Sequence, residues 1–221
     1  MLLVSSLYTA VDGVFISQYV GSDGLSAINI MLPLDTIFYG IAIMFGTGAS
    51  AIVGRKLGQG HTKEAKENFT LVTLAAIGIG AILTAVVVAF FKPVVLLLGA
   101  SERLLPYCME YGYILFGASM FTVVQVMYQS LFITAGKSQL ALILTTTSGV
   151  MNLVLDFLFI VVLQMGMAGA AWGTVAGLVL GGIFPLIYFL KDRGMLGYRR
   201  PKWDGMVLVK TITNGSSEMV S

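Results

Sequence analysis

The stretch FTLVTLAAIGIGAILTAVVVAFF (residues 69–91) contains no charged residue and is longer than the roughly 18 apolar residues that mark a membrane-spanning helix. A second uncharged run extends from Gln164 to Leu190. Both runs are continuously apolar, whereas the strands of a membrane β-barrel are segments of about ten residues with alternating polarity. The two runs therefore predict helices that cross a membrane.

The composition of the whole chain leads to the same class of protein. The 221 residues are 57% hydrophobic and only 11% charged, and the mean hydropathy is +0.90, whereas soluble domains carry about 25% charged residues. The 26 glycines fit this class, because glycine is a common packing residue between membrane helices. These values exclude a water-soluble globular domain.

Four further apolar stretches are found where charged residues stop and resume along the chain. A length of 221 residues accommodates six spans of about 20 residues each, together with their loops. The sequence thus predicts an all-α integral membrane protein with six transmembrane helices. The predicted spans lie near 1–20, 25–54, 69–91, 108–136, 138–163 and 166–190.

The basic residues predict the orientation, because cytoplasmic loops retain Lys and Arg. All but two of the 13 Lys and Arg residues follow the second, the fourth or the sixth predicted span. The other two, Lys92 and Arg103, lie between the third and fourth spans. We therefore expect a multi-pass protein of the plasma membrane with both chain ends in the cytoplasm.

Both ends of the sequence are abrupt. No basic residue precedes the first span, as one would in a signal peptide. At the other end, residues 191–211 are typical of a basic cytoplasmic linker, and residues 212–221 are typical of the start of a seventh, truncated helix. These features predict that the chain is a fragment.

Acidic residues inside the predicted spans are the first candidates for function. A carboxylate within a span costs about 2.5–3.5 kcal/mol on insertion scales and usually faces a cavity or a partner. Asn152 and Asp156 are four residues apart, so they share a helical face and offer an amide carbonyl beside a carboxylate. This pair suits a proton or a hard cation such as Na⁺. A purely structural hydrogen-bonding role explains the pair equally well.

The other two intramembrane acids differ in their surroundings. Asp12 is the only charged residue of its span, which favours a functional role. Asp35 follows Pro33, which interrupts the helical hydrogen-bond ladder, so the favoured interpretation is that Asp35 satisfies freed backbone groups. The alternative prediction for Asp35 is that it lines a cavity.

Two polar or small-residue patterns complete the set of candidates. Gln125, Tyr128 and Gln129 lie on one helical face, which predicts either a cavity wall or a polar contact between helices. In the last span, a glycine at every fourth position predicts the close approach of another helix, and Thr174 lies beside this stripe. The glycines are Gly169, Gly173, Gly177 and Gly181.

Other functional classes lack their motifs in this sequence. There is no G-x-x-x-x-G-K-[ST] phosphate loop, and His61, the single histidine, lies in a basic loop. Cys108 is the single cysteine, and the net charge of +2 is too small to suggest nucleic acid as a partner. We therefore expect no enzyme, no cofactor and no metal other than Na⁺ as a coupling ion.

Five segments resemble the amino-terminal lobe of a MATE (multidrug and toxic compound extrusion) transporter, in the order and spacing of that family. The more specific segments are NLVLDFLFI (152–160) and GMAGAAWGTVAG (166–177). The other three are YTAVDGVFISQYVGSDGLSAINIMLP (8–33), GTGASAIVGRKLGQG (46–60) and LLLGASERLLPYCMEYGYI (96–114).

The resemblance implies one six-helix lobe of a two-lobe, twelve-helix antiporter that exports organic, often cationic, drugs or toxic compounds in exchange for H⁺ or Na⁺. The positions that match the family's ion site are Asp12, Asn152, Asp156 and Thr174. Asp35 is not part of that pattern. The expected partners are membrane lipid, small organic substrates and the carboxy-terminal lobe that the chain lacks, without which we expect no transport.

Two alternative functions stay open. A lipid-linked oligosaccharide flippase of the same superfamily would be expected to line its cavity with basic residues that bind a pyrophosphate. No Lys or Arg lies inside a predicted span. A non-transporting helical scaffold in the membrane would have no need of the four ion-site residues together. Both alternatives are therefore disfavoured relative to ion-coupled export.

Overall fold

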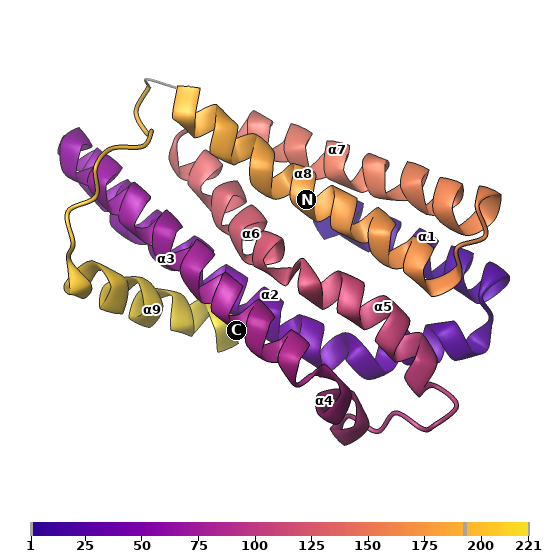
Figure 1. Cartoon of the computed structure of the whole chain (residues 1–221). Helices are drawn as coiled ribbons and strands as arrows, with labels where there is room; N and C mark the ends of the chain where they lie inside the picture. The colour runs from indigo at the N-terminus through magenta and orange to yellow at the C-terminus, as the bar shows by residue number, and fades with distance from the viewer. Residues whose placement is uncertain (1, 192–193, 221) are drawn as a thin grey trace. The chain divides into compact units, whose positions relative to one another are not determined.

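The structure is a computed structural model that describes the backbone of residues 2–191 and 194–220 and the side chains of residues 11–191 and 194–216. Within these ranges every regular element is a helix, as the composition predicts (Figure 1). The elements are α1 (Leu2–Tyr19), α2 (Ser22–Gly58), α3 (Thr62–Ala89), α4 (Phe91–Leu97), α5 (Leu105–Gly117), α6 (Ser119–Thr134), α7 (Ser138–Asp156), the π-helix η1 (Phe157–Val162), α8 (Gly166–Lys191) and α9 (Gly205–Val220).

The chain divides into two compact units, each assembled from three stretches of sequence. The first unit contains the residues up to Thr36, Ile82–Ser119 and Ile143–Leu180. The second contains Ile37–Ala81, Met120–Leu142 and the residues from Gly181 onward. The long helices α2, α3, α7 and α8 each contribute residues to both units.

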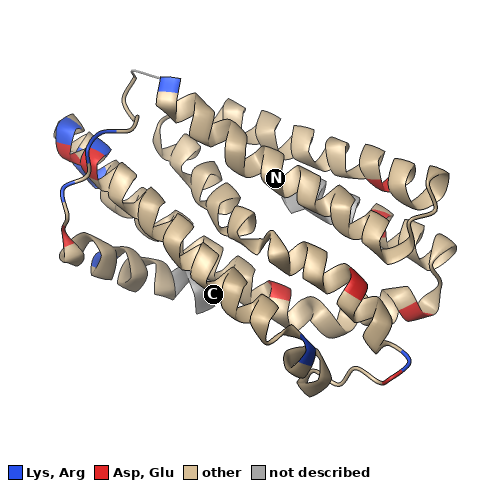
Figure 2. Ribbon diagram, viewed as in Figure 1, with Lys and Arg blue, Asp and Glu red and all other residues tan. Residues whose placement is uncertain are grey.

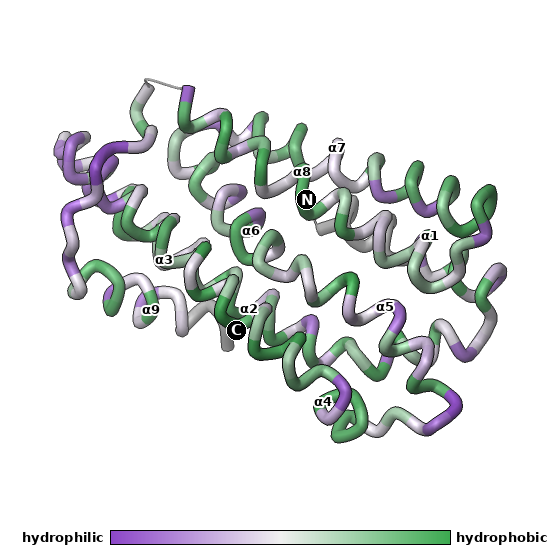
Figure 3. The backbone as a smooth tube through the Cα atoms, viewed as in Figure 1, coloured by the Kyte–Doolittle hydropathy of each residue, from purple (hydrophilic) through white to green (hydrophobic). Residues whose placement is uncertain are grey.

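Several elements are long and apolar enough to cross a membrane. Among the described residues these are α2, α3, α7 together with η1, and α8, and the pair α5 and α6, bent by 48°, is a fifth if the two helices are counted as one span. The remaining predicted span, near 1–20, corresponds to the 18 residues of α1. Hydrophobic residues follow the helices, and hydrophilic ones gather at the turn between α2 and α3 (Figure 3). The protein is therefore an all-α membrane protein.

The predicted span 108–136 is wrong as a single helix, because the helix breaks between α5 and α6. Gly117 has a low helix propensity, and the backbone N–H of Ala118 donates to Leu115 O at 3.1 Å, three residues back. The Ser119 hydroxyl donates to Phe116 O at 2.8 Å and so replaces a helical backbone bond. These local bonds turn the chain without any change in its hydropathy.

The ends of two other predicted segments also differ from the structure. The third span begins at Thr62 rather than 69, because charged residues continue the helix before the apolar run. It ends at Ala89 and is followed by the separate helix α4. The helix predicted from residue 212 begins at Gly205. Asp204 caps it, since the Met206 N–H donates to Asp204 Oδ1 at 2.9 Å.

Aromatic side chains fill the interior of each unit. In the first unit, the Phe91 ring lies 5.0 Å from the Tyr113 ring and 5.7 Å from the Phe116 ring, centroid to centroid. In the second unit, the Phe189 ring lies 4.9 Å from Phe69 and 4.8 Å from Phe132. These contacts fix α4 against α5 in one unit, and α8 against α3 and α6 in the other.

Candidate ion site

Asp156 lies at the junction where α7 gives way to the π-helix η1. The residue is 0% exposed, and within the described part of the chain neither of its carboxylate oxygens has a hydrogen-bond partner. The widened turn after it is visible in the bond from Leu163 N–H to Leu158 O, five residues apart. Single π-helical turns are frequent at functional sites. The junction therefore holds a buried carboxylate whose two oxygens are available to a ligand.

Asn152 and Thr174 join α7 to α8 next to this carboxylate. The Asn152 Nδ2 group donates to Thr174 Oγ1 at 3.4 Å, and the Thr174 hydroxyl donates to Ala170 O at 3.1 Å. These bonds leave Asn152 Oδ1 buried and without a partner among the described residues. Asn152 also interacts with Asp156, without forming a regular hydrogen bond to it. The predicted pair on one face of the helix is thus present.

The glycines of α8 allow this close arrangement. A Cβ atom on Gly173 would collide with Asp156 Oδ1, and one on Gly177 would lie 3.1 Å from Ser148 O. A Cβ atom on Gly169 would lie 3.1 Å from the backbone of Phe159 in η1. The stripe predicted from the sequence therefore brings α8 against α7 and η1, and Gly173 leaves the space that the Asp156 carboxylate occupies.

Asp12 reaches the same region from α1. The rings of Phe15 and Phe157 lie 6.5 Å apart and pack α1 against η1, directly beside Asp156 in the sequence. Asp12 lies one helical turn before Phe15, and its Oδ1 atom is buried with no partner in the described residues. Asp12 is close enough to act electrostatically on Asp156. Two carboxylates from different helices thus face one region of the first unit.

Tyr111 of α5 belongs to the same group, and the sequence reasoning missed it. Its side chain is 6% exposed, interacts with Thr174, and lies within electrostatic reach of Asp12, Asp35 and Asp156. Asp35 is half-buried in α2 of the same unit. Tyrosine is uncharged and does not stand out in an apolar span, so a search for charged residues misses Tyr111. A search for polar aromatic residues would have found it.

The three residues predicted as a cavity wall lie in the second unit. Tyr128 is 0% exposed, and its hydroxyl is hydrogen-bonded to the Tyr198 hydroxyl. Gln125 packs against Gly181 of α8, where a Cβ atom would overlap the Gln125 side chain. Gln129 is half-buried. Gln125 and Tyr128 therefore make contacts between elements, and a role in lining a cavity stays a prediction.

The chemistry of the first-unit cluster suits a small cation. Its oxygens come from two carboxylates, an amide and a hydroxyl, which are hard ligands of the kind that Na⁺ accepts, and a buried carboxylate also takes up a proton readily. Within the described residues, no group of three His, Cys, Asp or Glu side chains gathers as a metal site. An ion at this cluster would therefore need the oxygens of Asn152 and Thr174 as well as those of the carboxylates.

Comparison with known proteins gives the family. The MatE family model matches residues 1–158 of the chain. The chain belongs to the MATE family of multidrug efflux transporters.

Among curated proteins, the chain is similar to the multidrug export protein MepA of Staphylococcus aureus (strain MRSA252), with 27% identity over 190 residues. That match covers 86% of this chain and 42% of MepA. The MepA of Staphylococcus saprophyticus is 24% identical over 208 residues, covering 90% of this chain and 46% of that protein. The chain thus spans about half the length of the curated relatives it matches.

Solved structures share the fold. A structure described as the outward-facing conformation of a multidrug resistance MATE family transporter matches with a TM-score of 0.92 and 21% identity, over 99% of this chain and 49% of that one. An inward-facing structure described in the same words matches with a TM-score of 0.90 and 20% identity, over 97% and 49%. A MOP superfamily transporter from Pyrococcus furiosus matches with a TM-score of 0.92 and 20% identity, over 99% of this chain and 49% of that one.

Proposed function

We propose that this chain forms one lobe of a secondary antiporter that exports small organic compounds, often cationic, in exchange for H⁺ or Na⁺. One observation carries the proposal. Four buried oxygen atoms of Asp12, Asn152 and Asp156, in one unit of the structure, have no hydrogen-bond partner among the described residues. Buried polar atoms are normally paired. Four unpaired acceptors in one unit call for a bound cation or proton.

The proposed mechanism follows from the two carboxylates. When both are ionised, Asp12 and Asp156 repel each other in a medium of low dielectric constant. A proton or Na⁺ removes that repulsion and lets α1, which packs against η1 through Phe15 and Phe157, repack against it. The ion shifts the equilibrium between conformations by its differential affinity for them. Repacking of α1 then narrows the substrate route and releases the compound.

The likeness to solved structures supports a lobe that persists during transport. An outward-facing and an inward-facing transporter both match this fold nearly equally well. Alternating access in transporters with repeated lobes is largely a rigid-body movement of one lobe against the other. We propose that this chain supplies one such body in the plasma membrane, with the basic turn between α2 and α3 on the cytoplasmic side.

The test uses a full-length transporter that contains this lobe, reconstituted in liposomes with imposed H⁺ or Na⁺ gradients. We expect Asp12→Asn and Asp156→Asn to lower gradient-driven efflux about 5- to 150-fold, the usual range of a coupling free energy. Glu102→Gln, which neutralises an exposed carboxylate between α4 and α5, is the matched control and should keep the parent rate. Efflux at the parent rate in Asp12→Asn would refute the proposal.

The coupling ion is found by comparing the two gradients in the same vesicles. If Na⁺ is the ion, a Na⁺ gradient drives efflux at constant pH, and Na⁺ binding to the purified protein disappears in Asp156→Asn. If the proton is the ion, a pH gradient alone suffices and Na⁺ has no effect. Efflux that responds to neither gradient would contradict both forms of the mechanism.

A further inference from the structure

The segment that follows α8, residues 194–204, is docked onto the second unit rather than extended into solvent. Leu196 is 1% exposed. The Tyr198 ring lies 5.1 Å from the Phe69 ring of α3, and its hydroxyl is hydrogen-bonded to the Tyr128 hydroxyl of α6. Burial raises the pKa of the Tyr198 phenol, so the hydroxyl keeps its proton at neutral pH. This side chain therefore fixes the segment to two helices.

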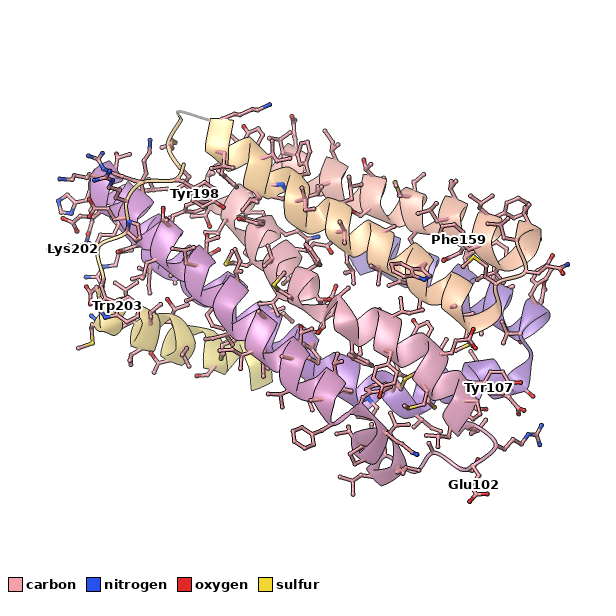
Figure 4. All side chains as sticks on the ribbon, viewed as in Figure 1. Glu102, Tyr107, Phe159, Tyr198, Lys202 and Trp203 are labelled. Atoms are coloured by element: carbon pink, nitrogen blue, oxygen red, sulfur yellow. The ribbon has the colours of Figure 1, made fainter. Side chains whose placement is uncertain are left out.

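Hydrogen bonds hold the segment on both sides of its exposed residues, 200–203. The Arg199 N–H donates to Thr70 Oγ1 at 3.0 Å, and Arg199 Nε lies 3.9 Å from Glu67 Oε1. At the other end, Asp204 caps α9 through the Met206 N–H. Residues 200–203 are thus restrained at both ends, and they occupy a defined place beside the turn between α2 and α3 (Figure 4).

The restrained residues present one large aromatic ring and two cations to the outside. Trp203 is 80% exposed, and Arg200 and Lys202 are exposed on the same short stretch. A tryptophan so exposed is unfavourable in water but is common at membrane interfaces, where the ring lies at the level of the headgroups. Lys and Arg near such an interface attract anionic lipids.

The neighbouring charges leave a positive excess at this place. Lys202 is close enough to act on Glu64, but Glu64 is paired with Lys56, and Glu67 is paired with Arg199. Blue residues gather, with some red ones, around the turn between α2 and α3 and along the segment before α9 (Figure 2). The basic residues of this region that form no ion pair with a carboxylate in the described part of the chain include Lys63, Lys66, Arg200 and Lys202.

We propose that Arg200, Lys202 and Trp203 form a docking surface for anionic phospholipid headgroups, here named the headgroup surface. The two cations bind the phosphate, and the indole ring lies among the glycerol backbones beside it. The contacts of Tyr198 and Arg199 fix the position of the headgroup surface before a lipid binds. A flexible basic tail would have to become ordered on binding. This site does not depend on the coupling ion or on the exported compound.

The test uses Trp203 as its own probe. The chain contains two tryptophans, and Trp172→Phe leaves Trp203 as the single one. This variant is reconstituted in phosphatidylcholine vesicles that contain equal small fractions of brominated phosphatidylglycerol or brominated phosphatidylcholine, with the bromine near the headgroup end. We expect brominated phosphatidylglycerol to quench the fluorescence more strongly, because local binding enriches it around Trp203.

The charge requirement is tested in the same variant. Arg200→Gln with Lys202→Gln should lower the ratio of the two quenching efficiencies several-fold toward one, because each basic residue near an anionic surface contributes roughly a fivefold factor in binding. Arg200→Lys with Lys202→Arg conserves the charge and should keep the preference. Lys92→Gln with Arg103→Gln removes two charges elsewhere and should also keep it.

Three outcomes would overturn the assignment. Equal quenching by the two lipids in the parent would show that no anionic headgroup is selected. A preference unchanged in Arg200→Gln with Lys202→Gln would place the lipid elsewhere. A preference abolished by inorganic phosphate at constant ionic strength would assign the surface to a soluble phosphate ligand instead of a lipid.

Discussion

Gly173 is the residue at which α8 leaves room for the Asp156 carboxylate. Because a Cβ atom there would overlap Asp156 Oδ1, we expect Gly173→Ala to displace the carboxylate from Asn152 and Thr174. Forcing an additional carbon into a packed site costs roughly 1–3 kcal/mol, which corresponds to a loss of ion affinity of roughly 5- to 150-fold. Titration calorimetry of the purified protein with Na⁺ measures this loss if Na⁺ is the ion. If the proton is the ion, the heat of proton uptake after a change of pH measures it.

A glycine with free space around it provides the control for that prediction. Gly78 of α3 has no neighbouring atom within 4 Å of the place that an alanine methyl group would occupy, so Gly78→Ala should leave ion affinity unchanged. Equal affinity in Gly173→Ala and Gly78→Ala would mean that the Asp156 carboxylate, held between α7 and α8, does not form the ion site.

At the level of single residues, the sequence predicts the polar residues of the candidate site but not their surroundings. Asn152 and Asp156 are identifiable from their spacing, because an intramembrane carboxylate is costly wherever it lies. Tyr111 is not, since its contribution depends on how α5 faces α8. Glu110 of α5 is a second such case, because its Oε1 accepts the Ala168 N–H at 3.2 Å and so satisfies a free donor at the start of α8.

Among the helices, α2 and α9 cross at close range in the second unit. A Cβ atom on Gly48 would overlap the Thr211 carbonyl oxygen, and one on Gly215 would overlap the Met44 carbonyl oxygen. The obstacle in both cases is backbone, which cannot rotate away as a side chain can. We expect Gly48→Ala to separate the two helices at a cost of roughly 1–3 kcal/mol.

The separation is measurable with spin labels at Ile37 of α2 and Ile212 of α9, two exposed positions of the second unit. Cys108→Ser removes the native cysteine before labelling. Gly48→Ala should lengthen or broaden the distance distribution and lower the thermal midpoint, whereas Gly78→Ala should change neither. An unaltered distribution in Gly48→Ala would contradict the close crossing of α2 and α9.

The ends of helices are the least predictable part of the fold. Apolar runs identify which residues lie in the membrane, but a helix continues or stops according to its backbone bonds. The Ser119 hydroxyl bond that separates α5 from α6 and the Asp204 cap that starts α9 are local features that hydropathy does not record. The π-helical turn after Asp156 likewise depends on how η1 packs against α1, which no single stretch of sequence contains.

For the molecule as a whole, the length of the chain relative to its relatives leads to a prediction. The chain spans 42% of the S. aureus MepA sequence, and the proposed antiporter needs a second lobe to enclose its substrate route. We expect the 221-residue chain alone, reconstituted in liposomes, to bind the coupling ion but to give no gradient-driven efflux above protein-free vesicles. Flux assays and ion binding on one preparation separate the two properties.

The full-length transporter under identical conditions is the positive control for that experiment. Efflux by the chain alone would show that one lobe, or a pair of identical lobes, suffices for transport. Loss of ion binding in the chain alone would show instead that the oxygens of Asp12, Asn152 and Asp156 do not form a complete site within this lobe.

The length of α2 has a practical consequence for imaging. Its 37 residues correspond to about 55 Å of helix, whereas the hydrocarbon core of a bilayer is about 30 Å thick. The helix is therefore longer than the core by about 25 Å along its axis, and its last turn carries Arg55 and Lys56, which favour the headgroup region or the water beyond it. Small membrane proteins are difficult to align in electron micrographs because a detergent micelle hides most of their mass. The protruding helix offers an attachment point for an antibody fragment that would serve as an alignment landmark.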